Sequence, residues 1–144
     1  MKKLLLSLLA VLFVLAGNAY PALADKAGNT DDGAVRFLRT VDKKMDGDND
    51  SWMLAHTSKA IQKAARDAYD YDCDAKVCYG WWILRTASQD MDNLVSIKSA
   101  GNGWYIVRRR HNDGQVDIRM RVARNGNSYK ITGLINPDHG ISIR

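Results

Sequence analysis

The repeat of apolar residues changes near residue 93, and this change constrains the fold of the chain more than any other feature. Before that point, apolar side chains recur every three or four positions, as on one face of a helix. Beyond it, apolar and polar side chains alternate, as in half-buried strands. Helices followed by a run of antiparallel strands predict an α+β fold, with N-terminal helices packed on a curved antiparallel sheet.

The first half of the chain predicts two helices. The first begins at a cap among residues 30–32, carries a helical stripe of apolar residues and stops before Gly47. The second is expected over residues 52–69. Residues 79–83 are apolar and fit either a short strand or a helical turn.

Four strands are expected in the second half, over residues 95–99, 104–111, 115–123 and 128–134. Turn signals rich in Gly and Asn separate them, and the connections at 112–114 and 125–127 have the composition of hairpin turns. We therefore expect a sheet in which consecutive strands are neighbours.

The first 24 residues have the three-part layout of a secretory signal peptide. A lysine pair precedes an apolar run over residues 4–16, and the segment ends on the small residues Ala22 and Ala24. The apolar run is too short to cross a bilayer about 30 Å thick comfortably as a permanent helix. We expect cleavage after Ala24, a location in the periplasm or outside the cell, no permanent membrane span, and a single domain over residues 25–144.

Two cysteines, Cys73 and Cys78, remain in the part expected to be exported. Because a close pair of cysteines in an oxidising compartment usually forms a disulfide, we expect a Cys73–Cys78 bond that clips a loop. Four residues separate the pair, so the spacing does not match the Cys-x-x-Cys motif of thiol–disulfide catalysts.

Charge is distributed unevenly along the chain, whose formal net charge is +5. Every acidic residue is an Asp, and the region after residue 92 carries nine Lys or Arg against three Asp. In the expected strand 115–123, the alternation sends the apolar side chains inward and Arg119 and Arg121 outward. We expect adjacent strands to extend this surface into a candidate basic face made of Arg108, Arg110, Arg119, Arg121 and Lys130.

Two interpretations of the candidate basic face are open. Its arginines suit an anionic partner, which guanidinium groups bind through paired hydrogen bonds. Alternatively, the face is only solvated, and its arginines pair across strands with Asp113 and Asp117.

Aromatic residues gather around the expected disulfide loop. The members of this candidate aromatic loop are Tyr71, Tyr79, Trp81 and Trp82. One interpretation is a lid that lines a ligand pocket or a protein interface. The other, which we favour, is that these rings fill the open end of the core.

Two local patterns accompany this order of elements. Ala87-Ser88-Gln89-Asp90 precedes the first long strand, and the last expected strand contains Tyr129-Lys130-Ile131. Over about residues 33–136, the chain thereby resembles the secreted bacterial domain-of-unknown-function family 3828. The resemblance implies a cystatin-like cone, similar to that of nuclear transport factor 2, and marks Gln89 and Asp90 as family-motif residues. The chain departs from the family at Gly133, where an acidic residue is common, and it lacks a Pro before the Gln89-Asp90 element.

Catalytic and metal-binding motifs are not recognisable in the sequence. Asp46-x-Asp48-x-Asp50 imitates the start of a calcium loop, but the later glycine and carboxylate of such a loop are missing. The three histidines lack metal-ligand spacing, and there is neither a nucleophile elbow nor a phosphate-binding loop. We therefore predict no catalytic residue, no metal and no cofactor.

These observations predict an exported, non-catalytic binding or interaction module. Its partner is expected to be an envelope protein or an anionic envelope component, and nucleic acid is not expected outside the cytoplasm. Two alternatives remain open. One is an inhibitor or immunity-type protein that neutralises an envelope enzyme or toxin. The other is a small hydrolase or isomerase with a site inside the cone.

Overall fold

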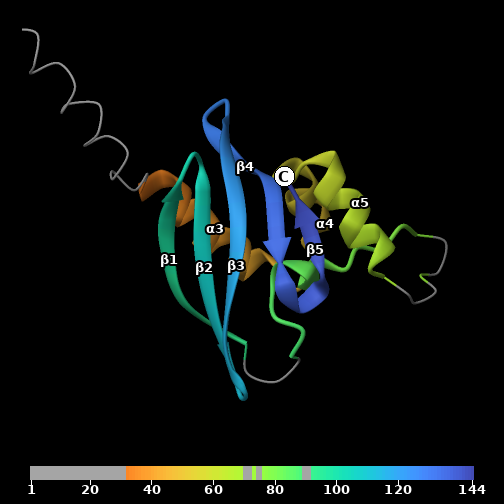
Figure 1. The fold of residues 1–144 in the computed structure, drawn as a ribbon. Coiled ribbons are helices and arrows are strands. Elements are labelled where there is room, and N and C mark those ends of the chain that lie inside the picture. The colour runs from red at the N-terminus through yellow and green to blue at the C-terminus, as the bar shows by residue number, and fades with distance from the viewer. Residues whose placement is uncertain (1–31, 70–72, 74–75, 89–91) are drawn as a thin grey trace, which may run out of the picture. The chain divides into compact units, whose positions relative to one another are not determined.

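The computed structural model describes residues 32–69, 73, 76–88 and 92–144, all within one compact unit, Asp31–Arg144. Helices precede a five-stranded antiparallel sheet, so the predicted α+β class is confirmed (Figure 1). The signal peptide expected over residues 1–24 lies outside the described residues. The helices are α3 (Asp32–Lys44), α4 (Asp50–Ala55) and α5 (Lys59–Asp67). The strands are β1 (Asn93–Gly101), β2 (Trp104–His111), β3 (Gly114–Asn125), β4 (Ser128–Asn136) and β5 (Ile141–Ile143).

The prediction of one helix over residues 52–69 is wrong, because the segment forms two helices that break at Thr57. Thr57 forms an isolated parallel bridge with Ile131 of β4, and the N–H of Ser58 donates to the carbonyl of Ile131 at 2.9 Å. The Ser58 side chain then caps α5 by accepting from the N–H of Ile61. Pairing with a strand far along the chain therefore takes the backbone out of the helix.

The sheet has the strand order β1-β2-β3-β4-β5, so consecutive strands are neighbours, as predicted. The fifth strand was not expected from the sequence. It has three residues, too few to show an alternation. Asn136 accepts from the N–H of Asp138 across a short 3₁₀ turn, and Gly140 then adopts a left-handed conformation (φ 63°) that returns the chain to β4.

The helices cover one face of the sheet, and α3 crosses behind β1 to β3 in the view of Figure 1. Along β3, Ile118, Met120 and Val122 are buried, while the residues between them are exposed. The inner face and the helices share one apolar core, which includes Phe37, Leu38, Val41, Met53, Ile61, Ala65, Tyr105, Val107, Ile131 and Leu134. The alternation predicted for β3 is therefore confirmed.

One arginine lies inside this core. Arg109 of β2 is only 1% exposed, whereas Arg108 and Arg110 on either side of it point to the other face. Its guanidinium donates to the carboxylates of Asp42 in α3 and Asp92 before β1. Nearby, Arg85 donates to the Asp46 carboxylate at 2.8 Å and to the Asp42 carbonyl at 2.9 Å. These ion pairs connect α3, the segment around residue 85 and the sheet.

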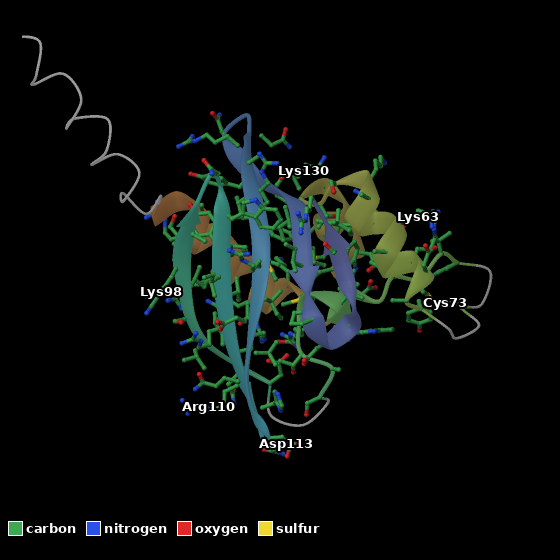
Figure 2. The ribbon with its side chains drawn as sticks, in the orientation of Figure 1. Lys63, Cys73, Lys98, Arg110, Asp113 and Lys130 are labelled. Atoms are coloured by element: carbon green, nitrogen blue, oxygen red, sulfur yellow. A yellow bond between two sulfur atoms is a disulfide. The ribbon has the colours of Figure 1, made fainter. Side chains whose placement is uncertain are left out.

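The Cys73–Cys78 disulfide is confirmed, and the two Cα atoms are 6.2 Å apart. Figure 2 shows Cys73 beyond the end of α5, at one side of the molecule. After Cys78, the N–H of Gly80 donates to the carbonyl of Ala65 at 2.7 Å, which ties the clipped loop to α5. The next residues form a 3₁₀ helix, Trp81–Leu84, so the helical alternative for this apolar segment is the one observed.

Candidate anion-binding site

The outer face of the sheet carries the candidate basic residues. Arg119 and Arg121 are exposed on β3, as the alternation predicted. Their register partners on β2 are Ile106 and Trp104, which therefore belong to the same outer face. Arg108 and Arg110 continue that face along β2, and Lys130 lies in register with the exposed Ala123.

Arg108 is engaged by a carboxylate of its own sheet. Its Nε and terminal nitrogen donate to the two carboxylate oxygens of Asp117 on β3, at 2.6 and 2.7 Å. This hydrogen bonding raises the pKa of Arg108 and holds the pKa of Asp117 below its ordinary value. The cross-strand pairing considered from the sequence is therefore present at this position, and Arg108 is not free to bind a ligand.

The five candidate basic residues do not gather at one point. Arg110 pairs in register with Gln115 near the β2–β3 turn, six residues from Trp104, which is about 20 Å along an extended strand. Figure 2 shows Arg110 close to Asp113 at one end of the sheet and Lys130 near the other. Arg119 and Arg121 lie two residues apart on the same face of β3. In the described part of the chain, neither has a carboxylate within ion-pair distance.

Trp104 and Gly133 give the outer face its shape beside these arginines. Trp104 is the register partner of Arg121, and Arg121 is the partner of Gly133 on β4. A Cβ at Gly133 would lie 2.8 Å from Cη2 of the Trp104 indole and 3.0 Å from Cβ of Arg121. The indole therefore reaches across β3 to β4 and occupies the space that any larger residue at position 133 would need.

A hollow of about 310 Å³ lies beside this indole. Trp104 and Arg119 line it together with Ile135 and Arg144, and the β1–β2 turn completes it through Ala100, Gly101 and Asn102. An aromatic ring next to an unpaired guanidinium suits an anionic ligand that also has an apolar face. Trp104 and Arg144 were not predicted from the sequence, although the alternation along the strand puts Trp104 on the same face as Arg108 and Arg110.

The candidate aromatic loop has two kinds of ring. Trp81 is buried, and its indole N–H donates to the carboxylate of Asp50 at 2.7 Å, so this ring does fill the core. Trp82 is exposed and lies near Tyr69, with the ring centroids 5.5 Å apart. Tyr79 is partly buried and stacks on Trp81. Tyr71 and the family-motif residues Gln89 and Asp90 lie outside the described residues.

The carboxylates that imitated a calcium loop have other roles. Asp46 accepts from Arg85, whose hydrogen bond lowers the pKa of that carboxyl, and Asp50 accepts from Trp81. Within the described ranges, no three His, Cys, Asp or Glu residues come together as a metal site. The hollow that Asp48 and Asp50 line with Tyr79 and Trp82 measures about 330 Å³ and contains no histidine.

Comparisons with known proteins give no assignment. No family model matches the chain, and no curated protein or solved structure matches it either. In the described part, no helix is long and apolar enough to cross a membrane.

Proposed function

We propose that the protein is an exported, non-catalytic binding module that recognises an anionic component of the cell envelope through the outer face of its sheet. The observation that carries this proposal is the pair of exposed arginines, Arg119 and Arg121, beside the Trp104 indole on β3 and β2. An indole packed over a strand glycine can stabilise a sheet by itself, so the combination of this ring with two unpaired arginines is what supports binding.

Charge and shape together favour this function over a merely solvated face. Arg108 is already neutralised by Asp117, so Arg119 and Arg121 carry the unpaired positive charge on the outer face of the central strand. The strand backbone fixes where these two side chains leave the sheet, and their contacts with an anion must exceed the entropy cost of ordering the exposed guanidinium groups. Paired hydrogen bonds from arginine then provide geometric selectivity for carboxylate, sulfate or phosphate.

Salt-dependent retention on heparin–agarose tests the proposal. The double variant Arg119→Ser, Arg121→Ser should elute at clearly lower salt than the natural protein. It makes fewer ionic contacts with heparin, so less salt is needed to screen those that remain. The matched control is Arg39→Ser, Arg66→Ser, which removes the same charge from exposed helical positions. If both double variants elute together, retention reports net charge only and the proposal fails.

Export is proposed from the signal-peptide layout, and the observed disulfide fits an oxidising compartment. Mass spectrometry of the protein recovered from cells should find Asp25 at the N-terminus. An intact Met1 on a membrane-bound product would contradict export. The cystatin-like cone implied by the family resemblance is likewise a proposal, and the helices on one face of a curved sheet support it.

An inhibitor or immunity-type role is the second candidate, because two large apolar side chains are exposed around the disulfide loop. Val77 is 58% exposed and Trp82 41%. Exposed aromatic residues are common anchors of protein interfaces. Pull-down from envelope extracts separates the two functions: a partner lost with Trp82→Ser but kept with Arg119→Ser, Arg121→Ser would favour this second role.

A further inference from the structure

A second hollow, independent of the outer sheet face, lies where α3 and α4 meet the β3–β4 turn. Its volume is about 430 Å³. Arg36 and Phe37 of α3, Trp52 of α4, and His56 immediately after it form one side, and Arg124 and Tyr129 from the β3–β4 hairpin form the other.

Four aromatic rings form the floor of this hollow. The His56 imidazole stacks on the Trp52 indole, with centroids 4.0 Å apart and planes 17° from parallel. Phe37 is buried beneath and lies 6.0 Å from Trp52, 5.9 Å from His56 and 5.7 Å from Tyr129. The other three rings are only partly buried. They therefore offer aromatic edges to a ligand, while Phe37 packs against all three rings.

His56 lines the hollow, and its hydrogen bonding decides which ring nitrogen can accept. Its Nδ1 lies 2.7 Å from the carbonyl oxygen of Trp52. Because a carbonyl can only accept, Nδ1 carries the proton, and Nε2 of the neutral ring is an acceptor. Among the described residues, no group hydrogen-bonds to Nε2. A ligand hydroxyl is a suitable donor to it.

The described lining of this hollow carries positive charge. Arg36 and Arg124 are both exposed, and in the part of the chain that the structure describes neither forms an ion pair with a carboxylate. The Arg124 guanidinium lies 5.2 Å from the Tyr129 ring centroid, a cation–π contact that holds it beside the aromatic floor. Among the described residues that line the hollow, none is an Asp. The two guanidinium groups therefore favour an anionic ligand.

We propose that this hollow binds a small aromatic acid: a flat ring that packs against the exposed edges of the stacked Trp52–His56 pair, an anionic group held by Arg36 and Arg124, and a hydroxyl that donates to Nε2 of His56. A simple inorganic anion would use the arginines and leave the rings unused. A neutral aromatic compound would leave both charges unpaired. Only the combination uses the rings, the charges and the acceptor together.

Titration with 4-hydroxybenzoate, followed by calorimetry and by the four indole N–H signals in NMR spectra, tests this site. Binding should shift the Trp52 signal and leave that of Trp104 unchanged. Two analogues test the two requirements, since 4-hydroxybenzyl alcohol lacks the charge and 4-hydroxycyclohexanecarboxylate lacks the flat ring. The alcohol should bind at least about tenfold more weakly, the factor that corresponds to one lost charge-assisted contact, and the cyclohexane analogue about threefold or more, as expected from lost aromatic packing.

Three variants locate the ligand. Arg36→Gln and Arg124→Gln should each weaken binding of 4-hydroxybenzoate about tenfold or more, whereas Arg39→Gln, on the same helix but outside the hollow, should not change it. His56→Phe keeps a stacking ring and should abolish the preference for 4-hydroxybenzoate over benzoate. Equal binding of acid and alcohol would overturn the proposal, as would a shift of Trp104 in place of Trp52. Absence of binding would overturn it as well.

Discussion

Arg109 and Arg119 lie on neighbouring strands of one sheet, and the two faces of that sheet use them in opposite ways. Arg109 points into the core, where the carboxylates of Asp42 and Asp92 neutralise it. Arg119 points to solvent, and in the described part of the chain no carboxylate pairs with it. The inner arginine connects α3 to the sheet, whereas the outer one remains available to a ligand.

The difference follows from the cost of removing charge from water. A buried guanidinium without partners would be very unfavourable, so the inner position demands carboxylates from other segments. An exposed guanidinium stays hydrated and needs no partner. A positive residue on the outer face can therefore serve binding without a stability requirement, and the comparison predicts very different consequences of mutation on the two faces.

The largest effect is expected at Arg109. Arg109→Met should destabilise the protein by about 3–5 kcal/mol, because it leaves the largely buried Asp92 carboxylate without its positive partner, whereas Asp42 keeps Arg85 at 4.0 Å. We expect a value toward the lower end, since Asp42 is 26% exposed and can be hydrated. Urea denaturation gives the free energy of unfolding. Arg119→Met, the same substitution on the outer face, should change it by no more than about 1 kcal/mol.

A triple variant sharpens this result. Replacing Arg109 by Met and both Asp42 and Asp92 by Asn removes the ion pairs without leaving an unpaired buried charge. Part of the free energy of unfolding lost in Arg109→Met should therefore return. If Arg109→Met and Arg119→Met had equal effects, the buried ion pairs would not stabilise the fold and the contrast between the faces would disappear.

A smaller effect is expected at Gly133, which affects the shape of the outer face but carries no charge. Gly133→Ala places a Cβ 2.8 Å from Trp104 Cη2 and 3.1 Å from the carbonyl oxygen of Ile143. We expect a loss of about 1–3 kcal/mol, typical of overpacking, and a displaced indole. Retention on heparin–agarose should fall although no charge has changed.

Ser142→Ala, an exposed substitution on the adjacent β5, is the matched control for Gly133→Ala. It should leave unfolding, the Trp104 indole signal and retention as they are. Unchanged retention in Gly133→Ala, despite a displaced indole, would show that the arginines bind anions without the Trp104 surface.

Much of this contrast was predictable from the alternation in β3. The alternation alone placed Arg119 and Arg121 on the outer face of the sheet and their apolar neighbours on the inner face. The alternation did not show which arginines would form ion pairs with carboxylates. Asp42 lies 67 residues from Arg109 in the chain, and local spacing contains no information about such a pair. The same limit explains the break between α4 and α5, because the residue that pairs with Thr57 is Ile131.

The hollows were less predictable than the strand faces. Trp104 and Gly133 belong to different strands, and only the register of β2, β3 and β4 brings them together. The hollow at His56 likewise needs α3, α4 and the β3–β4 hairpin to meet. Composition showed that aromatic and basic residues were numerous, and the tertiary fold decided which of them share a site.

The smallest effect on stability is expected at Asp117, the carboxylate that pairs with Arg108 on the outer face. Asp117→Asn should barely change the free energy of unfolding, because both partners are well exposed, yet it should raise the salt needed for elution from heparin–agarose.

Acid should change the retention of the natural protein in the same direction as Asp117→Asn. The hydrogen bond from Arg108 lowers the pKa of Asp117 below its ordinary 3.8, so the pair persists at neutral pH and its small stabilisation is lost as pH falls through that lowered pKa. Elution of the natural protein should therefore approach that of Asp117→Asn only below about pH 4, where the sulfate groups of heparin are still ionised. If the two proteins elute at the same salt at neutral pH, Arg108 does not reach the ligand, and binding belongs to Arg119 and Arg121 alone.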